Sequence, residues 1–573
     1  MNDARHDPVS PRPRGVFLAV NASFSHAGIA AGYFKGIAES AGWDWHTEEL
    51  VRGEAVQPAL VRVCALRPRM LAATFYLFTR QVALSFIRRF KALQPECLVV
   101  AGGPEFLGDN RAFLEAEPAV DLAVRGEGEN AFAAILANAG DPAALGRIPG
   151  VCRLANGAYQ DNGAAAPVAP LDAIPSPYPG LPIPFKRPFI LLETTRGCAN
   201  ACSFCTSAGT PVRSFSAGRV RSDLEAIRAR GIREVRVANR TFNDRAEHCL
   251  PLLRMFRDEF PELRFHLEID PARVTPALLR EFETAVPGRF HVEAGVQTLC
   301  DPVLRNLGRQ ATAARTLSGL RRLRAVPGLK LHADLIAGLP GGTLEHALSD
   351  LLALSALGPD EIQLEVLKLL PGTRLASERG QWGMVASPEP PYEVLRTGTM
   401  GVGELENARR LSRVVEWFYN PPDFTRLLAE ASRADPGFWP ALLDRASRML
   451  DAPDAPGLET RYRLLAEHFD WRGPPRLRHG LGYQWLKRGF SAMNGIVDAA
   501  PWRGPVPGDA ELVEGDPDEP VARAFRAELD LPHIFAFGRR SDIRSAVAVY
   551  RLPPAGPGRH VRGESRPAAQ MRA

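Results

Sequence analysis

Three closely spaced cysteines constrain this 573-residue chain more than any other feature of its sequence. Cys198, Cys202 and Cys205 follow the pattern C-x3-C-x2-C, directly after residues 189–192, an apolar run that is typical of a buried strand. Three thiolates on one loop can hold three irons of a [4Fe–4S] cluster. The fourth iron then has no protein ligand, and the amine and carboxylate of an amino-acid moiety fit that opening.

Two other interpretations of these cysteines are a zinc site and three unrelated thiols in the core. Zinc prefers four ligands, commonly in C-x2-C pairs, and the sequence offers no second pair. Cys249 lies on an expected helix and Cys300 in an expected loop, and two scattered cysteines cannot hold a cluster alone. We therefore expect one cluster, on the three clustered cysteines.

The cysteine loop resembles the signature of the radical S-adenosylmethionine (SAM) family. Cys198, Cys202 and Cys205 match its three ligand positions, and Phe204 matches the aromatic residue before the third cysteine. The resemblance implies that the open iron binds SAM and that an electron from the cluster cleaves SAM to a 5′-deoxyadenosyl radical. It also implies that Phe204 packs near the adenine and that an external reductant of the flavodoxin or ferredoxin type supplies the electron.

Charge and composition exclude several function classes. The chain has 70 basic and 65 acidic residues and a net charge of +5, too balanced to indicate nucleic acid or an anionic membrane as partner. Residues 1–14 have no apolar core, so we expect a disordered N-terminus rather than a signal peptide. Eight cysteines in a chain this long do not indicate a secreted disulfide framework. These observations predict a cytoplasmic protein that binds neither nucleic acid nor membrane.

Residues 15–150 alternate short apolar strands with helical segments, which predicts a doubly wound parallel sheet. The expected strands are 16–20, 43–50, 71–76, 97–101 and 121–124. Ligands of such sheets bind beyond the carboxyl ends of the strands. Two glycine-containing turns, Gly102-Gly103-Pro104 and Arg125-Gly126-Glu127-Gly128-Glu129, follow the fourth and fifth strands.

This segment resembles the Rossmann-like (flavodoxin-like) cobalamin-binding domain that precedes the radical domain in cobalamin-dependent radical SAM enzymes, the class B methyltransferases among them. The two turns carry the resemblance, and their glycines let the backbone approach a nucleotide tail or corrin edge closely. The Asp-x-His-x-x-Gly box, whose His ligates cobalt in other cobalamin proteins, is absent. The implied cobalamin-binding residues are His26, Thr74, Gly102, Gly103, Pro104, Glu127, Gly128 and Glu129.

Two of these candidates have structural alternatives. His26 follows the first strand and is a candidate for the lower face of the corrin, but a loop histidine bonded to backbone fits the same position. Thr74 ends the third strand and is a candidate for the nucleotide tail, but a satisfied strand threonine fits equally well.

Residues 189–380 contain six expected strands alternating with helices, which predicts a partial (β/α)6 barrel with its chemistry at the carboxyl ends of the strands. An inward carboxylate in a mostly apolar barrel needs a partner, and the ribose hydroxyls and ammonium of SAM would serve. The segments 295–298 and 334–340 also resemble strand ends of coproporphyrinogen-oxidase-like members of the family. The candidate SAM-binding residues are Phe204, Asn239, Glu268, Glu293, Gln297 and Asp334. The alternative for each is a hydrogen-bond network that fills the barrel, and no catalytic residue is assigned.

The remaining segments connect or follow these two domains. Residues 151–188 are rich in proline and predict an extended linker, with a short hairpin arm at its start. Residues 381–500 predict a mainly helical C-terminal domain, and residues 501–573 predict a loose extension with two paired strands, 532–537 and 545–552, and a disordered tail. This C-terminal region resembles a subgroup whose extension has no assigned function.

Three functions fit these observations. The first is a cobalamin-dependent radical SAM enzyme that methylates an unactivated carbon of a small-molecule or natural-product substrate. The second is a cobalamin-independent radical SAM enzyme, of rearrangement, cyclisation or redox chemistry, with a degenerate N-terminal domain. The third is a non-catalytic iron–sulfur redox sensor or scaffold. The sequence identifies neither the substrate nor the oligomeric state.

Overall fold

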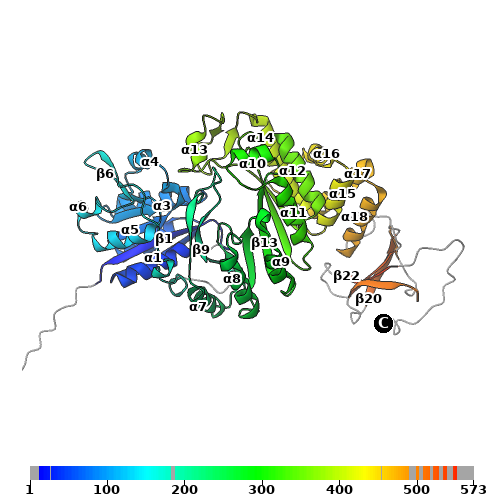
Figure 1. Cartoon of the computed structure of the whole chain (residues 1–573), viewed down its shortest axis with the longest axis horizontal. Helices are drawn as coiled ribbons and strands as arrows, with labels where there is room; N and C mark the ends of the chain where they lie inside the picture. Colours follow the sequence, from blue (N-terminus) through cyan, green and yellow to red (C-terminus); the bar gives the residue numbers. More distant parts are fainter. Residues whose placement is uncertain are drawn as a thin grey trace, which may run out of the picture. The chain divides into compact units, whose positions relative to one another are not determined.

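The computed structural model of the chain describes residues 12–25, 28–181, 187–452, 454–488, 499–501, 508–515, 521–527, 533–538 and 546–551. Its contacts divide the chain into two compact units (Figure 1). The first unit comprises Met1–Thr343 and Val366–Leu405, and the second comprises Leu344–Glu365 and Glu406–Ala573. No helix among the described residues is long and apolar enough to cross a membrane.

The N-terminal part of the first unit is a seven-stranded sheet with the order β2-β1-β3-β4-β5-β6-β7. The first five strands pair in parallel, in the order that defines flavodoxin-like doubly wound sheets, so the predicted fold is confirmed. The strands are β1 (Arg14–Asn21), β2 (Asp44–Val51), β3 (Met70–Thr74), β4 (Leu98–Gly102), β5 (Leu122–Val124), β6 (Val151–Ala155) and β7 (Ala158–Asp161).

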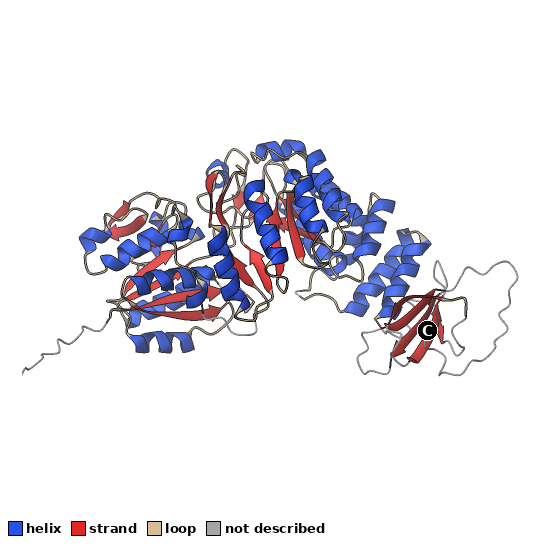
Figure 2. Ribbon diagram, turned by 60° about the horizontal axis from the view of Figure 1, so that its bottom comes forward, coloured by secondary structure: helices blue, strands red, loops and turns tan. Residues whose placement is uncertain are grey.

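Helices cover both faces of this sheet (Figure 2). In α3 the buried residues Ala83, Phe86, Ile87 and Phe90 recur at helical spacing, so one stripe of the helix packs on the strands. The central strands are buried on both faces and are apolar throughout, as parallel strands covered by helices require. The helices are α1 (Ile29–Ser40), α2 (Gln57–Leu66), α3 (Arg80–Leu93), η1 (Pro104–Phe106), α4 (Arg111–Ala116), α5 (Gly128–Ala137) and α6 (Pro142–Leu145).

The start of the predicted linker belongs to this sheet. Strand β6 pairs antiparallel with β7, which confirms the predicted short hairpin, and with β5, so the hairpin extends the sheet. Asn156 and Gly157 both have positive φ, the backbone of a tight two-residue hairpin turn. The described residues of the proline-rich part that follows contain two short turns, η2 (Leu171–Ala173) and η3 (Tyr178–Gly180).

The second sheet of the first unit lies in the segment for which a partial barrel is predicted, and its strands β8, β11, β12, β13 and β14 pair in parallel. Side chains alternate along these strands between a fully buried and a half-buried face. The strands are β8 (Ile190–Leu192), β11 (Glu234–Val237), β12 (Arg264–Ile269), β13 (Phe290–Gln297) and β14 (Lys330–Ala337). The sixth predicted strand is β15 (Glu361–Val366), and it falls in the second unit apart from its last residue.

The helices of this segment follow the strands in the predicted alternation. They are α7 (Ala217–Arg228), α8 (Ala246–Asp258), η4 (Pro271–Arg273), α9 (Pro276–Glu283), α10 (Asp301–Asn306), α11 (Ala313–Arg324) and α13 (Arg374–Glu378). A two-stranded ribbon, β16 (Val385–Ala386) and β17 (Val394–Arg396), follows them.

The sequence prediction missed a hairpin around the three cysteines. Strand β9 (Thr195–Cys198) pairs antiparallel with β10 (Thr210–Ser214), and the loop between them carries Cys202 and Cys205. The helix expected after the loop, near residues 219–230, is confirmed as α7, and β10 lies between the loop and this helix. The two strands are short and only partly apolar, so neither gives a periodic signal.

The second unit contains helices and an antiparallel sheet. Its helical part comprises α12 (Leu344–Leu357), the later residues of α14 (Val402–Val414), the π-turn η5 (Val415–Tyr419), α15 (Thr425–Ala434), α16 (Phe438–Ala446), α17 (Leu458–Arg472) and α18 (Pro475–Lys487). The five-stranded sheet has the order β18-β20-β21-β22-β19. Its strands are β18 (Ala499–Pro501), β19 (Glu511–Gly515), β20 (Val521–Ala527), β21 (His533–Gly538) and β22 (Ala546–Arg551).

The sequence predicted fewer strands in this last region than the structure contains. The two expected strands correspond to β21 and β22, which pair as predicted, but three further strands join them. Most of the segment between residues 499 and 551 thus forms a sheet where we expected a loose connection. The expected disordered tail lies outside the described residues.

Candidate functional site

The three cysteines lie on the β9–β10 hairpin. Cys198 ends β9, and the backbone N–H of Cys205 donates to the Cys202 carbonyl at 3.0 Å. Gly197 precedes Cys198 with a φ of 93°, and a Cβ there would lie 2.2 Å from the Pro211 carbonyl oxygen. Only glycine fits this position, because the two strands of the hairpin approach each other too closely for a side chain.

The environment of the thiols fits a bound cluster. Cys198 and Cys202 are both buried. Burial, opposed by Arg309 and supported by Cys205 and Cys198, raises the pKa of the Cys202 thiol to about 11. The backbone N–H of Ser207 donates to Cys205 Sγ at 3.4 Å. Buried thiols ionise when a metal takes the place of the proton, and thiolates are the ligands that iron–sulfur clusters use.

The spacing of the sulfurs does not fit a single zinc ion. Among the described residues, two groups of His, Cys, Asp or Glu have ligand atoms within 4.8 Å of one another, and neither contains these cysteines. Sulfurs around one zinc ion would lie about 3.8 Å apart, given zinc–sulfur bonds of about 2.3 Å in a tetrahedron. The three sulfurs therefore do not form a ready site for one zinc ion.

Asn239 anchors the segment that leads to the cysteines. Its Oδ1 accepts hydrogen bonds from the backbone N–H groups of Thr194 and Thr195, each at 3.0 Å, and its Nδ2 donates to Thr194 Oγ1 at 2.7 Å. The side chain is fully buried. We expected Asn239 to bind SAM, but its amide is engaged by the protein, so we now interpret it as a positioning residue.

The predicted carboxylates meet histidines on the half-buried face of the sheet. His266 Nε2 lies 2.7 Å from Glu293 Oε2, and His332 Nε2 lies 3.2 Å from Asp334 Oδ1. The ligand atoms of Glu293, His332 and Asp334 all lie within 4.8 Å of one another. Burial raises the pKa of Glu293, but the His266 hydrogen bond and nearby histidines outweigh it, so the pKa is lowered overall.

Glu268 differs from its neighbours. Among the described residues, its carboxyl has no hydrogen-bond partner, although its register partner on β13 is Glu293. Burial, followed by repulsion from Glu293, raises the pKa of Glu268 to about 7. A half-buried carboxyl without a hydrogen-bond partner, near the end of a barrel strand, is suited to a ligand that brings a positive charge or hydroxyl groups.

Gln297 ends β13 in a strained conformation. Its φ is 69°, a value that non-glycine residues rarely adopt, and the register with β14 shifts between Gly295 and Gln297. Such outliers persist where the surrounding structure imposes them and often mark ligand sites. The bulge turns the Gln297 side chain back over Gly295, so a Cβ on Gly295 would lie 2.9 Å from Gln297 Nε2.

Sequence reasoning missed Arg309, a buried cation close to the cluster loop. Its Nη2 donates to the Gly295 carbonyl at 2.5 Å and lies 3.7 Å from Asp270 Oδ1. Its charge acts on the Cys202 thiol and opposes the effect of burial on the pKa of that thiol. Arg309 is suited to bind an anion such as the carboxylate of SAM. The sequence shows Arg309 directly after Gly308, but our search for candidates considered polar residues at the ends of predicted strands, and Arg309 does not follow a strand.

Most of the predicted cobalamin-binding residues line one cavity at the carboxyl ends of the first sheet. The cavity has a volume of about 170 Å³. It is lined by Phe17, Phe34, Ala72, Ala73, Thr74, Val100, Gly102, Gly103, Val124, Gly126, Glu127, Gly128, Glu129, Phe132 and Arg196. Pro104 begins η1 and does not line it, and His26 lies outside the described residues. The structure therefore brings together six of the predicted residues, which are Thr74, Gly102, Gly103, Glu127, Gly128 and Glu129.

The glycines of the two turns fit a cradle for a ligand. Gly103 has a φ of 102°, and a Cβ there would lie 2.9 Å from the Phe75 carbonyl oxygen. A Cβ on Gly102 would meet only the Val124 side chain, at 3.8 Å, so it would project into open cavity space. A mostly apolar cavity beyond parallel strands, bounded by bare backbone, fits the tail of a nucleotide cofactor.

The two glutamates of the cavity are paired with arginines of the cluster hairpin. Arg196 Nη1 lies 2.7 Å from Glu129 Oε1, and Arg213 Nη1 donates to Glu127 Oε2 at 3.0 Å. Glu127 Oε2 also accepts the backbone N–H of Val168 at 2.8 Å. These two carboxylates therefore fix the position of Arg196, Arg213 and Val168 at the wall of the cavity.

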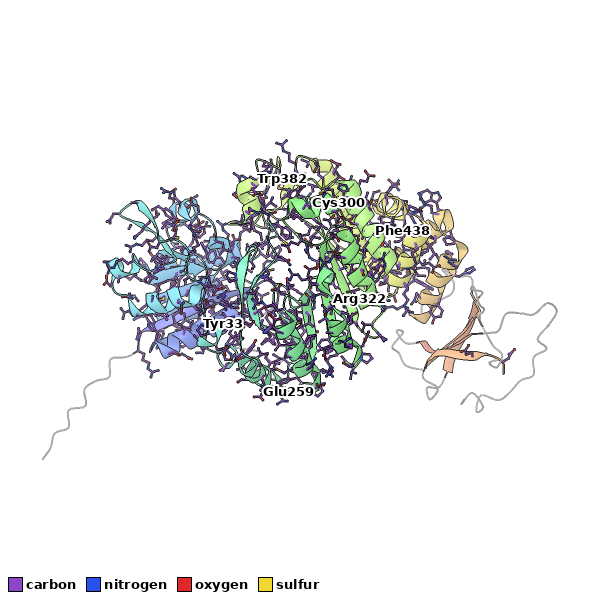
Figure 3. The ribbon with its side chains drawn as sticks, viewed as in Figure 1. Tyr33, Glu259, Cys300, Arg322, Trp382 and Phe438 are labelled. Carbon is purple, nitrogen blue, oxygen red and sulfur yellow. The ribbon has the colours of Figure 1, made fainter. Side chains whose placement is uncertain are left out.

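Tyr33 and Tyr76 extend this region, and the sequence prediction missed both. Tyr33 of α1, labelled in Figure 3, donates its hydroxyl to Glu193 Oε2 at 3.0 Å. Tyr76 follows β3 and keeps 41% of its surface accessible, yet burial raises the pKa of its hydroxyl, and Glu193 and Arg196 act on it.

Three family models match the chain. Residues 192–352 match the radical SAM superfamily, residues 15–136 match the B12 binding domain, and residues 380–435 match a protein of unknown function (DUF4080). The first two matches confirm the radical SAM and cobalamin-binding domains that the sequence predicts. The third falls at the start of the region for which no function was predicted.

The similar proteins include modifying enzymes with cobalamin or a radical SAM domain. The chain is 30% identical over 263 residues to the ribosomal protein uS12 methylthiotransferase RimO of Moorella thermoacetica, which covers 44% of this chain and 60% of that protein. The chain therefore spans less than two thirds of the length of this curated relative.

Two solved structures share the fold. The radical SAM methyltransferase TsrM of Kitasatospora setae, solved with cobalamin and a [4Fe-4S] cluster bound, has 19% identity and a TM-score of 0.55 over 66% of this chain and 78% of its own. The cobalamin-dependent SAM radical enzyme OxsB, with aqua-cobalamin and SAM bound, has 14% identity and a TM-score of 0.59 over 83% of this chain and 79% of its own. At these identities the likeness concerns the fold.

Proposed function

We propose that this chain, which belongs to the radical SAM proteins with an N-terminal B12-binding domain, is a cobalamin-dependent methyltransferase that acts on an unactivated carbon of a small molecule. The observation that carries the proposal is the position of Arg196. It lies on the same short strand as Cys198 and also lines the cavity that collects the predicted cobalamin residues. The sites expected for the two cofactors are therefore adjacent.

Each cofactor has residues suited to hold it. Cys198, Cys202 and Cys205 would hold the [4Fe–4S] cluster, and the glycine turns and Thr74 would hold cobalamin. When bound, the cluster and SAM supply a carbon-centred radical, and cobalamin supplies a methyl group. The protein's own contribution is to bind these groups at a fixed distance and to exclude water from them.

The residues proposed for SAM surround the cluster loop. Arg309 would pair with the carboxylate of SAM, because it is a buried cation beside Cys202. Glu268 would face the ribose hydroxyls or the positive sulfonium, since its carboxyl has no other hydrogen-bond partner among the described residues. Gln297 ends β13, and Asp334 lies on the neighbouring strand β14. Phe204 is half-buried in the cluster loop, next to Cys205, where it would pack on the adenine.

The proposed partners are a small-molecule substrate and an external one-electron reductant of the flavodoxin or ferredoxin type. The balanced charge of the chain supports a small molecule over nucleic acid. TsrM, one of the structural neighbours, was solved with tryptophan as substrate and a SAM analog. The name of RimO, in contrast, describes the modification of a ribosomal protein, so the substrate screen should include macromolecules.

The test is an anaerobic reconstitution with iron, sulfide and hydroxocobalamin, followed by an absorption spectrum and an assay of SAM with dithionite. We expect a cluster, retained cobalamin, and both 5′-deoxyadenosine and S-adenosylhomocysteine as products. A cluster and 5′-deoxyadenosine without cobalamin retention would favour the cobalamin-independent enzyme. A stable cluster without any SAM cleavage would favour the redox sensor or scaffold.

A further inference from the structure

Two arginines join the cluster hairpin to the wall of the cavity from opposite strands of the hairpin. Arg196 of β9 and Arg213 of β10 are direct register partners, so they lie side by side across the ribbon. The loop that carries Cys202 and Cys205 begins after β9 and ends before β10. The base of the cluster loop is therefore fixed by the same residues that reach the cavity.

The two arginines share one carboxylate on the cavity side, because Arg196 Nη1 also lies 3.6 Å from Glu127 Oε2. Arg196 pairs with Glu129 at 2.7 Å, and its guanidinium lies over the Tyr33 ring at 5.4 Å. Arg213 pairs with Glu127 and donates to the Val168 carbonyl at 2.5 Å. The guanidinium groups are largely buried, with 13% and 16% of the two side chains exposed, so their ion pairs are weakly screened.

The glutamates belong to the turn that would contact cobalamin. Glu127 and Glu129 alternate with Gly126 and Gly128, and all four line the cavity. A ligand that seats against this turn would contact the backbone that positions both carboxylates. The carboxylates fix the arginines in turn, because each pair is close and shielded from water.

We propose that Arg196 and Arg213 couple the two cofactor sites, so that the cluster raises the affinity of the protein for cobalamin and cobalamin raises its affinity for the cluster. This inference rests on the proposed function, because it needs both cofactors to bind. Arg196 and Arg213 are positioning residues here. By thermodynamic linkage the two effects must be equal in size, and couplings of this kind are commonly 5-fold or more.

The test is a pair of binding measurements with hydroxocobalamin. The dissociation constant is measured anaerobically by equilibrium dialysis for the cluster-reconstituted protein and for the same protein after the iron is removed with a chelator. We expect the reconstituted wild type to bind about 5-fold tighter or more, from the usual range of couplings. In Arg196→Met and in Glu129→Gln, we expect cobalamin to bind more weakly in both states and with a ratio close to 1.

The ratio of the two constants separates coupling from simple structural damage. A variant that only disturbs the fold would weaken both states and keep the wild-type ratio, which would overturn the proposal. Arg196→Lys should restore part of the ratio, because the positive charge beside Glu129 remains. Arg221→Met is the matched control, since Arg221 pairs with Glu259 on the protein surface, away from both sites.

Two results in the wild type also decide the proposal. A ratio of 1 with tight cobalamin binding overturns the coupling and leaves the proposed function standing. Failure of the wild type to bind cobalamin in either state overturns both, and moves the function to the cobalamin-independent enzyme.

Discussion

The side chain of Asn239 binds Thr194 twice, accepting its backbone N–H at 3.0 Å and donating to its hydroxyl at 2.7 Å. Asn239 follows β11, whereas Thr194 precedes the cluster strand β9, so one buried amide joins segments 45 residues apart in the sequence. The cluster loop is thereby attached to the central sheet at its root.

Replacing this amide should loosen the cluster loop. Asn239→Ala leaves two buried backbone N–H groups without an acceptor, at a cost of roughly 1–3 kcal/mol for each unsatisfied group. We expect a lower free energy of unfolding in urea and a lower iron content after reconstitution. Wild-type iron content in this variant would show that the loop does not depend on Asn239.

The three cysteines should be required for the cluster and dispensable for cobalamin. In Cys198→Ala we expect loss of the visible absorption of the cluster and of most bound iron, because three thiolates hold the irons together. Cobalamin should still be retained, though with lower affinity if the coupling described above holds. Cys300→Ala is the control, since Cys300, labelled in Figure 3, directly precedes α10 and is not part of the cluster loop. An intact cluster in Cys198→Ala would refute the assignment.

A bulky side chain in the cavity should exclude cobalamin. In Gly102→Phe the ring would enter the cavity, because the Cβ meets only Val124, at 3.8 Å. We expect loss of cobalamin retention in gel filtration, with cluster assembly close to that of the wild type. Gly140→Phe is the matched control, since a Cβ at Gly140 meets nothing within 4 Å and Gly140 does not line the cavity. Retention of cobalamin by Gly102→Phe would place the ligand elsewhere.

SAM affinity should depend on pH through Glu268. Its pKa of about 7 lies above the ordinary value of 4.5, so the carboxyl is neutral below about pH 7 and charged above it. The charged form attracts the positive sulfonium of SAM, so we expect the dissociation constant of SAM to fall several-fold between pH 6 and pH 8. In Glu268→Gln this dependence should disappear. If the dissociation constant of SAM still changes with pH in Glu268→Gln, the pH dependence belongs to another group.

Replacing Gln297 with glycine should lower SAM cleavage without changing the stability of the protein. A left-handed non-glycine residue costs about 1 kcal/mol, which Gln297→Gly would remove, while the extra freedom of glycine in the unfolded chain offsets about the same amount. We expect a free energy of unfolding within about 1 kcal/mol of the wild type, and SAM cleavage reduced at least tenfold. Asn156→Gly, at another position with positive φ, should leave SAM cleavage unchanged. Full activity in Gln297→Gly would remove Gln297 from the SAM site.

The regular elements were predictable because their signals are local. The predicted strands of both parallel sheets correspond to β1–β5, β8 and β11–β15, since buried parallel strands read as short apolar runs between helical segments. The glycine turns were found for the same reason, because they follow such runs directly. Their shared cavity then follows from the topology, which brings the ends of neighbouring strands to one edge.

The features that sequence reasoning missed depend on contacts distant in the sequence. The β9–β10 hairpin contains few apolar residues, so its sequence has no hydrophobic periodicity that would predict two strands. Contacts with distant residues such as Asn239 and Glu129 stabilise it. Arg309 and Tyr76 are ordinary residues in loops, and only their neighbours in space give them a role. Asn239 shows the converse: a polar residue at a strand end looked available for SAM, but its amide bonds Thr194 and Thr195, and the SAM contact stays a prediction.

The composite wall of the cavity limits how this protein can be recombined with its relatives. The B12-binding match ends at residue 136, yet Arg196 completes the cavity from within the radical SAM match, residues 192–352. A transplanted N-terminal domain would therefore lack Arg196, one of the residues that line the cavity. A domain exchange should keep residues 127 and 129 together with residues 196 and 213, because these four charges pair with one another. A junction placed in the linker would separate them.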